Sequence, residues 1–143
     1  MLVVFIAIVG ASILFLYVPS PVVSISYPTA GIVQQNVIVY GTASNVPLGA
    51  VLVACGLRPQ YRLYYPQNPA VIIQPSGKWS GQMYLGSAND ASKQFTISAV
   101  LAVNGTFASY ARNAETTGNW PGITPENYAN SVNTCDQITV TRA

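Results

Sequence analysis

An uncharged apolar run opens the chain and constrains what the chain can become. The stretch "MLVVFIAIVGASILFLYV" has no charged side chain from Met1 to Val18, and Pro19 and Pro21 end it. A helix of this length spans about 27 Å, close to the hydrocarbon thickness of a bilayer. Its apolar side chains would point in every direction, so lipid or other copies of the helix must surround it. We therefore predict an N-terminal hydrophobic α-helix over residues 1–20, as a membrane anchor or a filament core.

The flanks of this run leave its role open among anchor, filament core and cleaved signal. A cleaved signal peptide has a basic start and a small-residue cleavage site, and "LYVPSP" offers no such site. An uncleaved anchor usually carries Lys or Arg on its cytoplasmic side. The first charged side chain here is Arg58. Two explanations stay open: a leader removed by prepilin-type processing, or a short N-terminus with weak topological guidance.

Residues 21–143 are predicted to form one β domain. Val23 to Ser26 alternate apolar and polar side chains, and further short runs cover residues 51–55, 61–65, 70–73, 79–85, 95–103 and 137–141. Turn signals such as "NVPLG" and "PSGK" separate them. About seven short strands without a helical period predict an antiparallel β-sandwich. Within it we expect Trp79 in the core, a bulge at Gly81 and a single helical turn at "TPENYAN" with Pro125 at its first helical position.

The composition argues against catalysis and against nucleic-acid binding. Only 7% of the 143 residues are charged, the net charge is +2, and there is no histidine. Nucleic-acid binding needs clustered Lys and Arg, and no cluster exists. The four carboxylates, Asp90, Glu115, Glu126 and Asp136, are scattered along the sequence. We therefore predict no enzyme activity, no metal site and no cofactor.

Two cysteines and one sequon bear on the compartment. Cys55 and Cys135 form an even pair behind a hydrophobic segment, which suggests a disulfide in an oxidising compartment; two buried free thiols are the alternative. Asn104 begins an "NGT" sequon and is a possible glycosylation site.

An aromatic and basic cluster is the candidate contact patch. Tyrosine and arginine are common interface residues. The alternative is a strand with one core face and one solvated face. The patch consists of Arg58, Tyr61, Arg62, Tyr64, Tyr65 and, further along, Trp120.

The body resembles an immunoglobulin-like extracytoplasmic module of bacterial and archaeal surface proteins. The stretches that carry this resemblance are "IVYGTASNVPLGAVLVA", "YYPQ", "PSGKWSGQMYLG", "FTISAVLA", "GITP" and "DQITVTR", between Pro21 and Arg142. A hydrophobic helix before a β domain is also similar to an archaeal-type pilin, although this helix stops at Pro19. The resemblance implies an immunoglobulin-like sandwich that serves as a stalk, an adhesive unit or an assembly domain.

These observations together predict a non-catalytic structural or interaction protein. Residues 1–18 would contact membrane lipid or other hydrophobic helices. The domain would lie on the extracytoplasmic side as an accessory or assembly subunit. Its protein partners would be other proteins or further copies of itself. A pilin-like filament subunit and a glycan-binding adhesive module are the alternatives.

Overall fold

Strand β7 (Gln94–Ala102) is buried on both of its faces, and the other elements are arranged around it. Phe95, Ile97 and Leu101 face a core between two sheets. Ser98 lies on the other face, and Val100 there packs into a second core beneath two helices. A strand between two cores has apolar residues at successive positions, which explains the run "ISAVLA". The domain therefore has three layers.

The computed structural model describes residues 18–58, 62–67, 71–103, 105–118, 121–129 and 134–143. The described strands besides β7 are β1 (Val22–Tyr27), β2 (Gly31–Val33), β3 (Asn36–Ser44), β4 (Val51–Arg58), β5 (Leu63–Pro66), β6 (Lys78–Tyr84) and β8 (Thr134–Arg142). The helical elements are the 3-10 turn η1 (Ala88–Asp90), α1 (Thr106–Thr117) and α2 (Pro125–Ala129).

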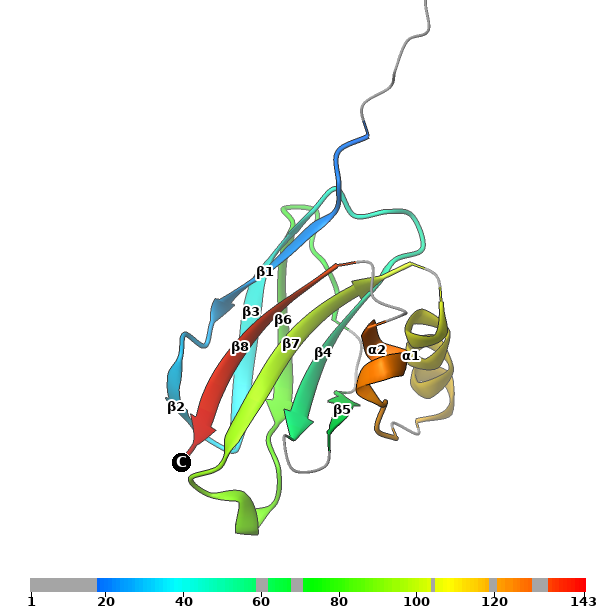
Figure 1. Cartoon of the computed structure of the whole chain (residues 1–143). Coiled ribbons are helices and arrows are strands. Elements are labelled where there is room, and N and C mark those ends of the chain that lie inside the picture. Colours follow the sequence, from blue (N-terminus) through cyan, green and yellow to red (C-terminus); the bar gives the residue numbers. More distant parts are fainter. Residues whose placement is uncertain (1–17, 59–61, 68–70, 104, 119–120, 130–133) are drawn as a thin grey trace, which may run out of the picture.

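The strands form a three-stranded and a five-stranded sheet. The first has the order β1-β3-β6 and the second the order β2-β8-β7-β4-β5. The pairing is antiparallel except between β2 and β8, which run parallel. Figure 1 shows β1 entering at one end of the domain, whereas the C-terminus and the β6–β7 connection lie at the other.

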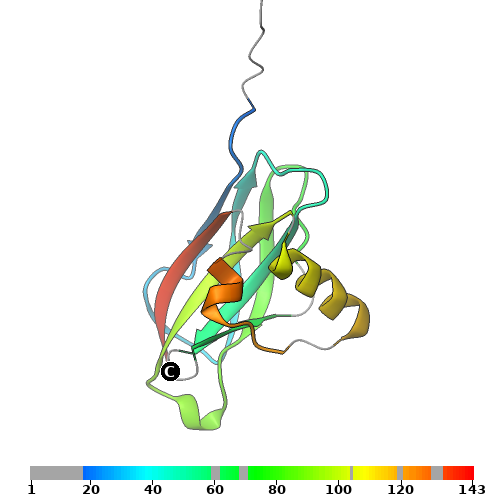
Figure 2. The same ribbon diagram turned by 45° about the vertical axis from the view of Figure 1, so that its right-hand side comes forward.

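Helices α1 and α2 lie between β7 and β8 in the sequence and pack on the outer face of the five-stranded sheet near β4 and β5 (Figures 1 and 2). Phe107, Ala108, Ala111 and Ala114 recur at helical spacing and are buried. Gly118 ends α1 at a φ of 70°, and its N–H donates to the carbonyl of Ala114 over 2.7 Å. A left-handed residue that closes the last turn favours glycine.

The predicted fold class is wrong as a whole, although the chain is mainly β. The described residues form two sheets, but one strand pair is parallel and two helices add a third layer. The predicted N-terminal helix lies almost entirely outside the described residues, and residues 18–20 are not helical. Within the described ranges, no helix has the length and apolar character needed to cross a membrane.

Several local predictions are confirmed and one is wrong. Trp79 is 2% exposed in the core, and α2 begins at Pro125, as predicted. The "PSGK" turn is closed by the N–H of Gln74, which donates to the Lys78 carbonyl over 2.9 Å. Gly81 marks no bulge, because β3 and β6 pair in unbroken register across it. The register shift lies in β1 instead, between Ile25 and Tyr27.

Candidate binding surfaces

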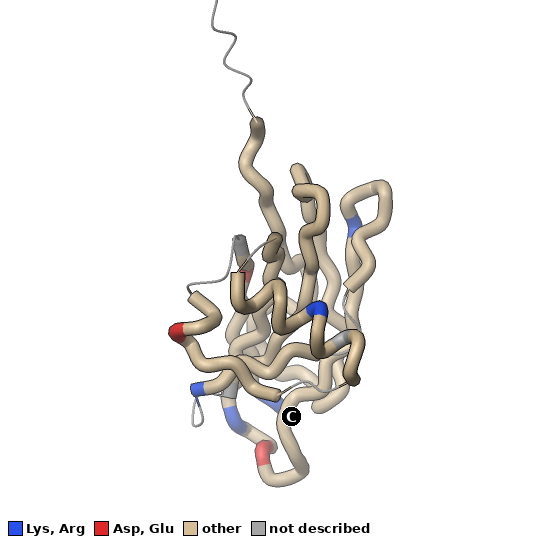
Figure 3. The backbone as a smooth tube through the Cα atoms, turned by 90° about the vertical axis from the view of Figure 1, so that its right-hand side faces the viewer, with Lys and Arg blue, Asp and Glu red and all other residues tan. Residues whose placement is uncertain are grey.

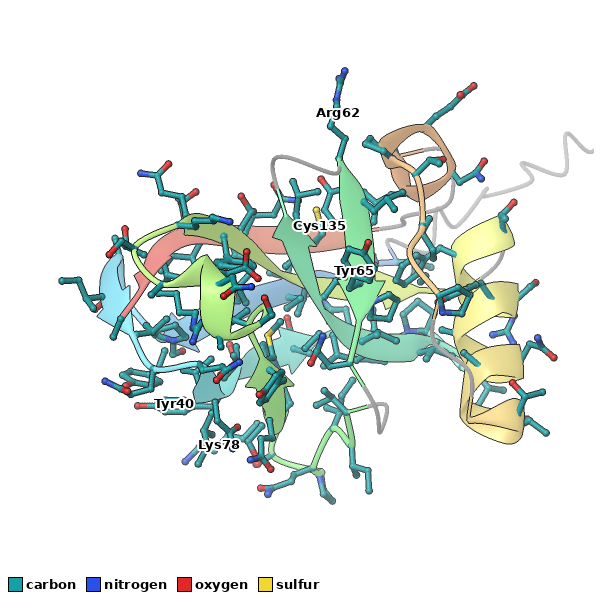
Figure 4. All side chains as sticks on the ribbon, turned by 90° about the horizontal axis from the view of Figure 1, so that it is seen from below. Tyr40, Arg62, Tyr65, Lys78 and Cys135 are labelled. Carbon is teal, nitrogen blue, oxygen red and sulfur yellow. The ribbon has the colours of Figure 1, made fainter. Side chains whose placement is uncertain are left out.

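The predicted aromatic and basic patch does not form one surface among the described residues. Tyr64 is buried and stacks on Tyr128, with ring centroids 3.8 Å apart. Arg62, at a φ of 51°, points away from the domain (Figure 4). Tyr65 lines a groove instead. Tyr61 and Trp120 lie outside the described residues, and so does Asn104 of the sequon. For Arg58, only the backbone at the end of β4 is described.

Cys55 and Cys135 are free thiols in this structure. They lie on β4 and β8, with β7 between them: Cys55 is opposite Ser98, and Cys135 is opposite Val100. Two strand spacings separate their Cα atoms by roughly 10 Å or more. A disulfide needs a Cα separation below about 7 Å. The predicted disulfide is therefore not formed, and forming it requires the strands to move.

The buried cysteine lies beneath the helices near two tyrosines. Desolvation raises the pKa of Cys55 well above the usual range, and the nearby Cys135 adds to this effect. Burial also raises the pKa of Tyr110 to about 12 and that of Tyr128 further still. The reactive form of cysteine is the thiolate. Cys55 is therefore protonated near neutral pH and is a packing residue rather than a nucleophile.

A groove of about 460 Å³ is lined by residues from the ends of β4, β5 and β6 and from the start of β7. Figure 1 shows these strand ends at the end of the domain opposite the one where β1 enters. Strand β4 contributes Gly56, strand β5 contributes Tyr65, and Phe95 of β7 is 3% exposed. This volume falls within the range of roughly 300–1,000 Å³ that small-molecule sites occupy. We call it the Tyr65 groove; its lining includes Gly56, Tyr65, Gln67, Tyr84, Ser87 and Phe95.

A cluster of charged and polar groups around the buried Asp90 fixes the Ser87 side of the groove. The carboxylate of Asp90 accepts hydrogen bonds from the backbone N–H of Ser87 over 2.7 Å and from its hydroxyl over 2.8 Å. Lys93 pairs with the same carboxylate over 2.9 Å. The guanidinium of Arg142 donates to the carbonyl of Ser87. Asp90, Lys93 and Arg142 thus fix the backbone at Ser87. None of these three side chains lines the groove.

The strand edges beside the groove already have partners. The backbone of Tyr64 on β5 exchanges two hydrogen bonds with Ile123, each 2.8 Å long. On β6, the N–H of Tyr84 donates to the side-chain oxygen of Gln67 over 2.9 Å. The N–H of Leu85 donates to the carbonyl of Gln35 over 2.7 Å. An added peptide strand would therefore find these edge positions occupied.

The outer face of the three-stranded sheet is a second candidate surface, which we call the open face. Ile38 is 60% exposed and Tyr40 is 46% exposed, and Tyr40 stacks on Tyr27 with ring centroids 5.3 Å apart. Lys78 of β6, which pairs with Thr42 of β3, is a charged residue on this open face. Tyr40 and Lys78 lie on the side of the molecule away from Arg62 (Figure 4).

The carboxylates whose contacts the structure describes serve structural roles. Asp90 holds the Ser87 wall, and a carboxylate oxygen of Asp136 on β8 accepts a hydrogen bond from the N–H of Ile25 on β1 over 2.7 Å. The described charged residues lie at separate places in the domain and do not gather on one side of it (Figure 3). Among the described residues, no group of three His, Cys, Asp or Glu side chains is placed to hold a metal ion.

No protein-family model matches the chain, and no curated protein matches it.

Proposed function

We propose that the chain is a non-catalytic interaction subunit that is held by its N-terminal segment and presents its β domain to a partner. The observation that carries this proposal is the placement of the two ends. The first described residues enter at one end of the domain, and the Tyr65 groove lies at the other (Figure 1). A domain held at residues 1–18 therefore presents the groove on the side away from its attachment.

The composition of residues 1–18 supports an apolar attachment. No charged side chain occurs before Arg58. A charged side chain at the centre of a bilayer costs about 2.5–3.5 kcal/mol by insertion scales, and an uncharged run avoids that cost. We propose that these residues lie in lipid or against hydrophobic segments of other subunits. The domain then faces the extracytoplasmic side as part of a surface or membrane assembly.

Extraction of the full-length chain from membranes tests this proposal. We expect the chain to resist alkaline carbonate and to be released by detergent. The variant Ile8→Asp should move a large part of it to the carbonate supernatant, whereas Ser12→Ala, on the same segment, should not. Electron microscopy of the detergent-free surface fraction, with an antibody to the domain, then separates the two attachments. Label on membrane patches supports an anchor, and labelled fibres support the filament alternative. A soluble monomer in the absence of detergent contradicts both.

A further inference from the structure

We infer that the Tyr65 groove binds an uncharged saccharide. This inference deepens the proposed function by naming the class of ligand that the exposed end of the domain would recognise. It rests on the lining of the groove, on the partners of the surrounding backbone and on the size of the space.

The lining combines aromatic rings with uncharged polar groups. Tyr65 and Phe95 supply rings, and Tyr84 borders the groove from the exposed face of β6. Gln67 and Ser87 add an amide and a hydroxyl, each of which already makes a hydrogen bond within the protein and keeps further bonding capacity. No hydrogen bond joins the hydroxyl of Tyr65 or Tyr84 to another described residue. A sugar ring has an apolar C–H face and a rim of hydroxyls. Aromatic side chains with a polar end match both parts of such a ligand.

The absence of charge in the lining argues against anionic and cationic ligands. None of the residues that line the groove is Asp, Glu, Lys or Arg. Phosphate and carboxylate ligands are normally held by Arg, Lys or a helix N-terminus. The nearby charges of Asp90, Lys93 and Arg142 bind one another or the Ser87 wall. An uncharged ligand is therefore favoured.

The occupied strand edges and the small space argue against a protein partner in the groove. A peptide that adds a strand needs free backbone groups. Both backbone groups of Tyr64 and the N–H of Tyr84 are already paired. A stable protein interface buries about 800 Å² on each partner. A groove of about 460 Å³ is instead in the range of small-ligand sites.

Two backbone features make the groove a fixed site. Gly56 leaves its floor without a side chain, and a Cβ at this position would lie 3.5 Å from Leu85 Cδ2, an ordinary contact. Gly86 has a φ of 68°, and a Cβ there would lie 2.7 Å from Phe95 Cζ and 2.8 Å from an Asp90 carboxylate oxygen. The wall at Gly86 and Ser87 is thus held by close packing before any ligand arrives, which lowers the cost of binding.

Titration of the full-length chain with defined oligosaccharides tests this inference. The chain is kept in a zwitterionic detergent, because a maltoside detergent would itself offer a sugar to the groove. The probes are cellotetraose, mannotetraose and chitotetraose, with tetragalacturonate as the anionic comparison. We expect at least one uncharged probe to bind with a Kd of about 1 mM or tighter by calorimetry. Binding of tetragalacturonate as tightly as the best uncharged probe overturns the inference, and so does failure of all three uncharged probes at this limit.

Matched variants locate the binding. Tyr65→Ala should weaken it by about tenfold or more, as expected for an aromatic anchor. Tyr65→Phe keeps the ring and should weaken it less. Gly56→Ala places a methyl group on the floor without a clash and should also weaken binding. Tyr40→Ala, on the open face, should leave it unchanged.

Two results would overturn the groove as the site: affinity unchanged in both Tyr65→Ala and Gly56→Ala, or affinity lost in Tyr40→Ala. A chain that binds sugar but behaves as a soluble monomer would contradict the anchoring proposal and leave this inference standing.

Discussion

The two sheets differ in what covers their outer faces. Helices α1 and α2 pack on the five-stranded sheet, and Phe107 of α1 is fully buried there. The three-stranded sheet has no such layer within the described residues, and Ile38 and Tyr40 remain exposed. The same chain thus builds one sheet between two cores and one sheet with a single core. The residues between β7 and β8 make the difference.

This difference is visible in the order of side chains along the strands. Strand β3 alternates strictly between exposed and buried residues from Asn36 to Ser44. Strand β7 is buried at seven of its nine positions. Gln94 is exposed and Thr96 is half-buried, so continuous burial begins at Ile97. Alternation indicates one covered face, and a continuous apolar run indicates two. The apolar run in β7 therefore indicates by itself that both faces of this strand are covered.

The largest effect should come from removing the side chain that joins α1 to the five-stranded sheet. Phe107→Ala should lower the free energy of unfolding by about 3–5 kcal/mol, because it removes buried apolar surface and leaves a cavity. Urea denaturation followed by circular dichroism measures this loss. Ser109→Ala, at an exposed position of the same helix, is the control and should change the free energy by less than about 0.5 kcal/mol. A loss below about 1 kcal/mol for Phe107→Ala would show that the helices contribute little to the fold.

The covered face should also make the domain sensitive to alkaline pH. Folding raises the pKa of Cys55 well above its ordinary value of 9.0, mainly through desolvation. It also raises the pKa of Tyr110 from 10.0 to about 12, for the same reason. The neutral forms are therefore favoured in the folded state. Their stabilising contribution is complete below pH 9 and is lost as the pH rises through the folded-state pKa values. For the fully buried Cys55, the free energy of unfolding should fall by about 1.4 kcal/mol per pH unit while the thiol titrates only in the unfolded chain. The partly exposed Tyr110 should contribute less.

Urea denaturation at a series of pH values from 7 to 11 measures this slope. In Cys55→Ala, the free energy of unfolding should fall less steeply with pH above pH 9. The reason is that the variant lacks the thiol that ionises first when the chain unfolds. Ser109→Ala, at an exposed position of α1, removes no titrating group and is the control. An unchanged slope in Cys55→Ala would contradict the assignment of the effect to the buried thiol.

Much of the β architecture was predictable from the sequence, and the helical layer was not. The turn at Gly77, the burial of Trp79 and the start of α2 at Pro125 followed from local patterns. Helix α1 was missed, although Phe107, Ala111 and Ala114 recur at helical spacing. Its buried positions are mostly alanines, which give a weak apolar signal, and Asn and Thr around them suggested a loop.

The candidate groove could not be predicted from local patterns. It joins Gly56, Tyr65, Tyr84 and Phe95, which come from four strands of two sheets. Only Tyr65 belonged to the predicted patch. Its neighbour Tyr64 points to the other face of β5 and enters the core beneath the helices. Alternation along a strand predicts that such neighbours separate, but it does not say which of the two lies in a groove.

The end of α1 should show a smaller effect that depends only on backbone conformation. Gly118 has a φ of 70°, and a Cβ there would meet no other atom within 4 Å. Gly118→Ala should therefore cost about 1 kcal/mol, from the left-handed conformation alone. Gly118→Asn should cost less, since asparagine tolerates this conformation better. Equal losses for the two variants in urea denaturation would contradict this explanation.

The smallest effect is expected on the open face. Ile38→Thr keeps a β-branched side chain on β3 and removes an apolar group that is already 60% exposed. The free energy of unfolding should change by less than about 0.5 kcal/mol at every protein concentration. Val39→Thr, at the adjacent and fully buried position, is the contrasting variant and should cost several times more. If Ile38→Thr instead lowers stability more at high protein concentration than at low, the open face is buried against another copy, because association stabilises the folded state by mass action. The outer face of the three-stranded sheet would then be exposed only in the isolated chain and buried when two copies associate.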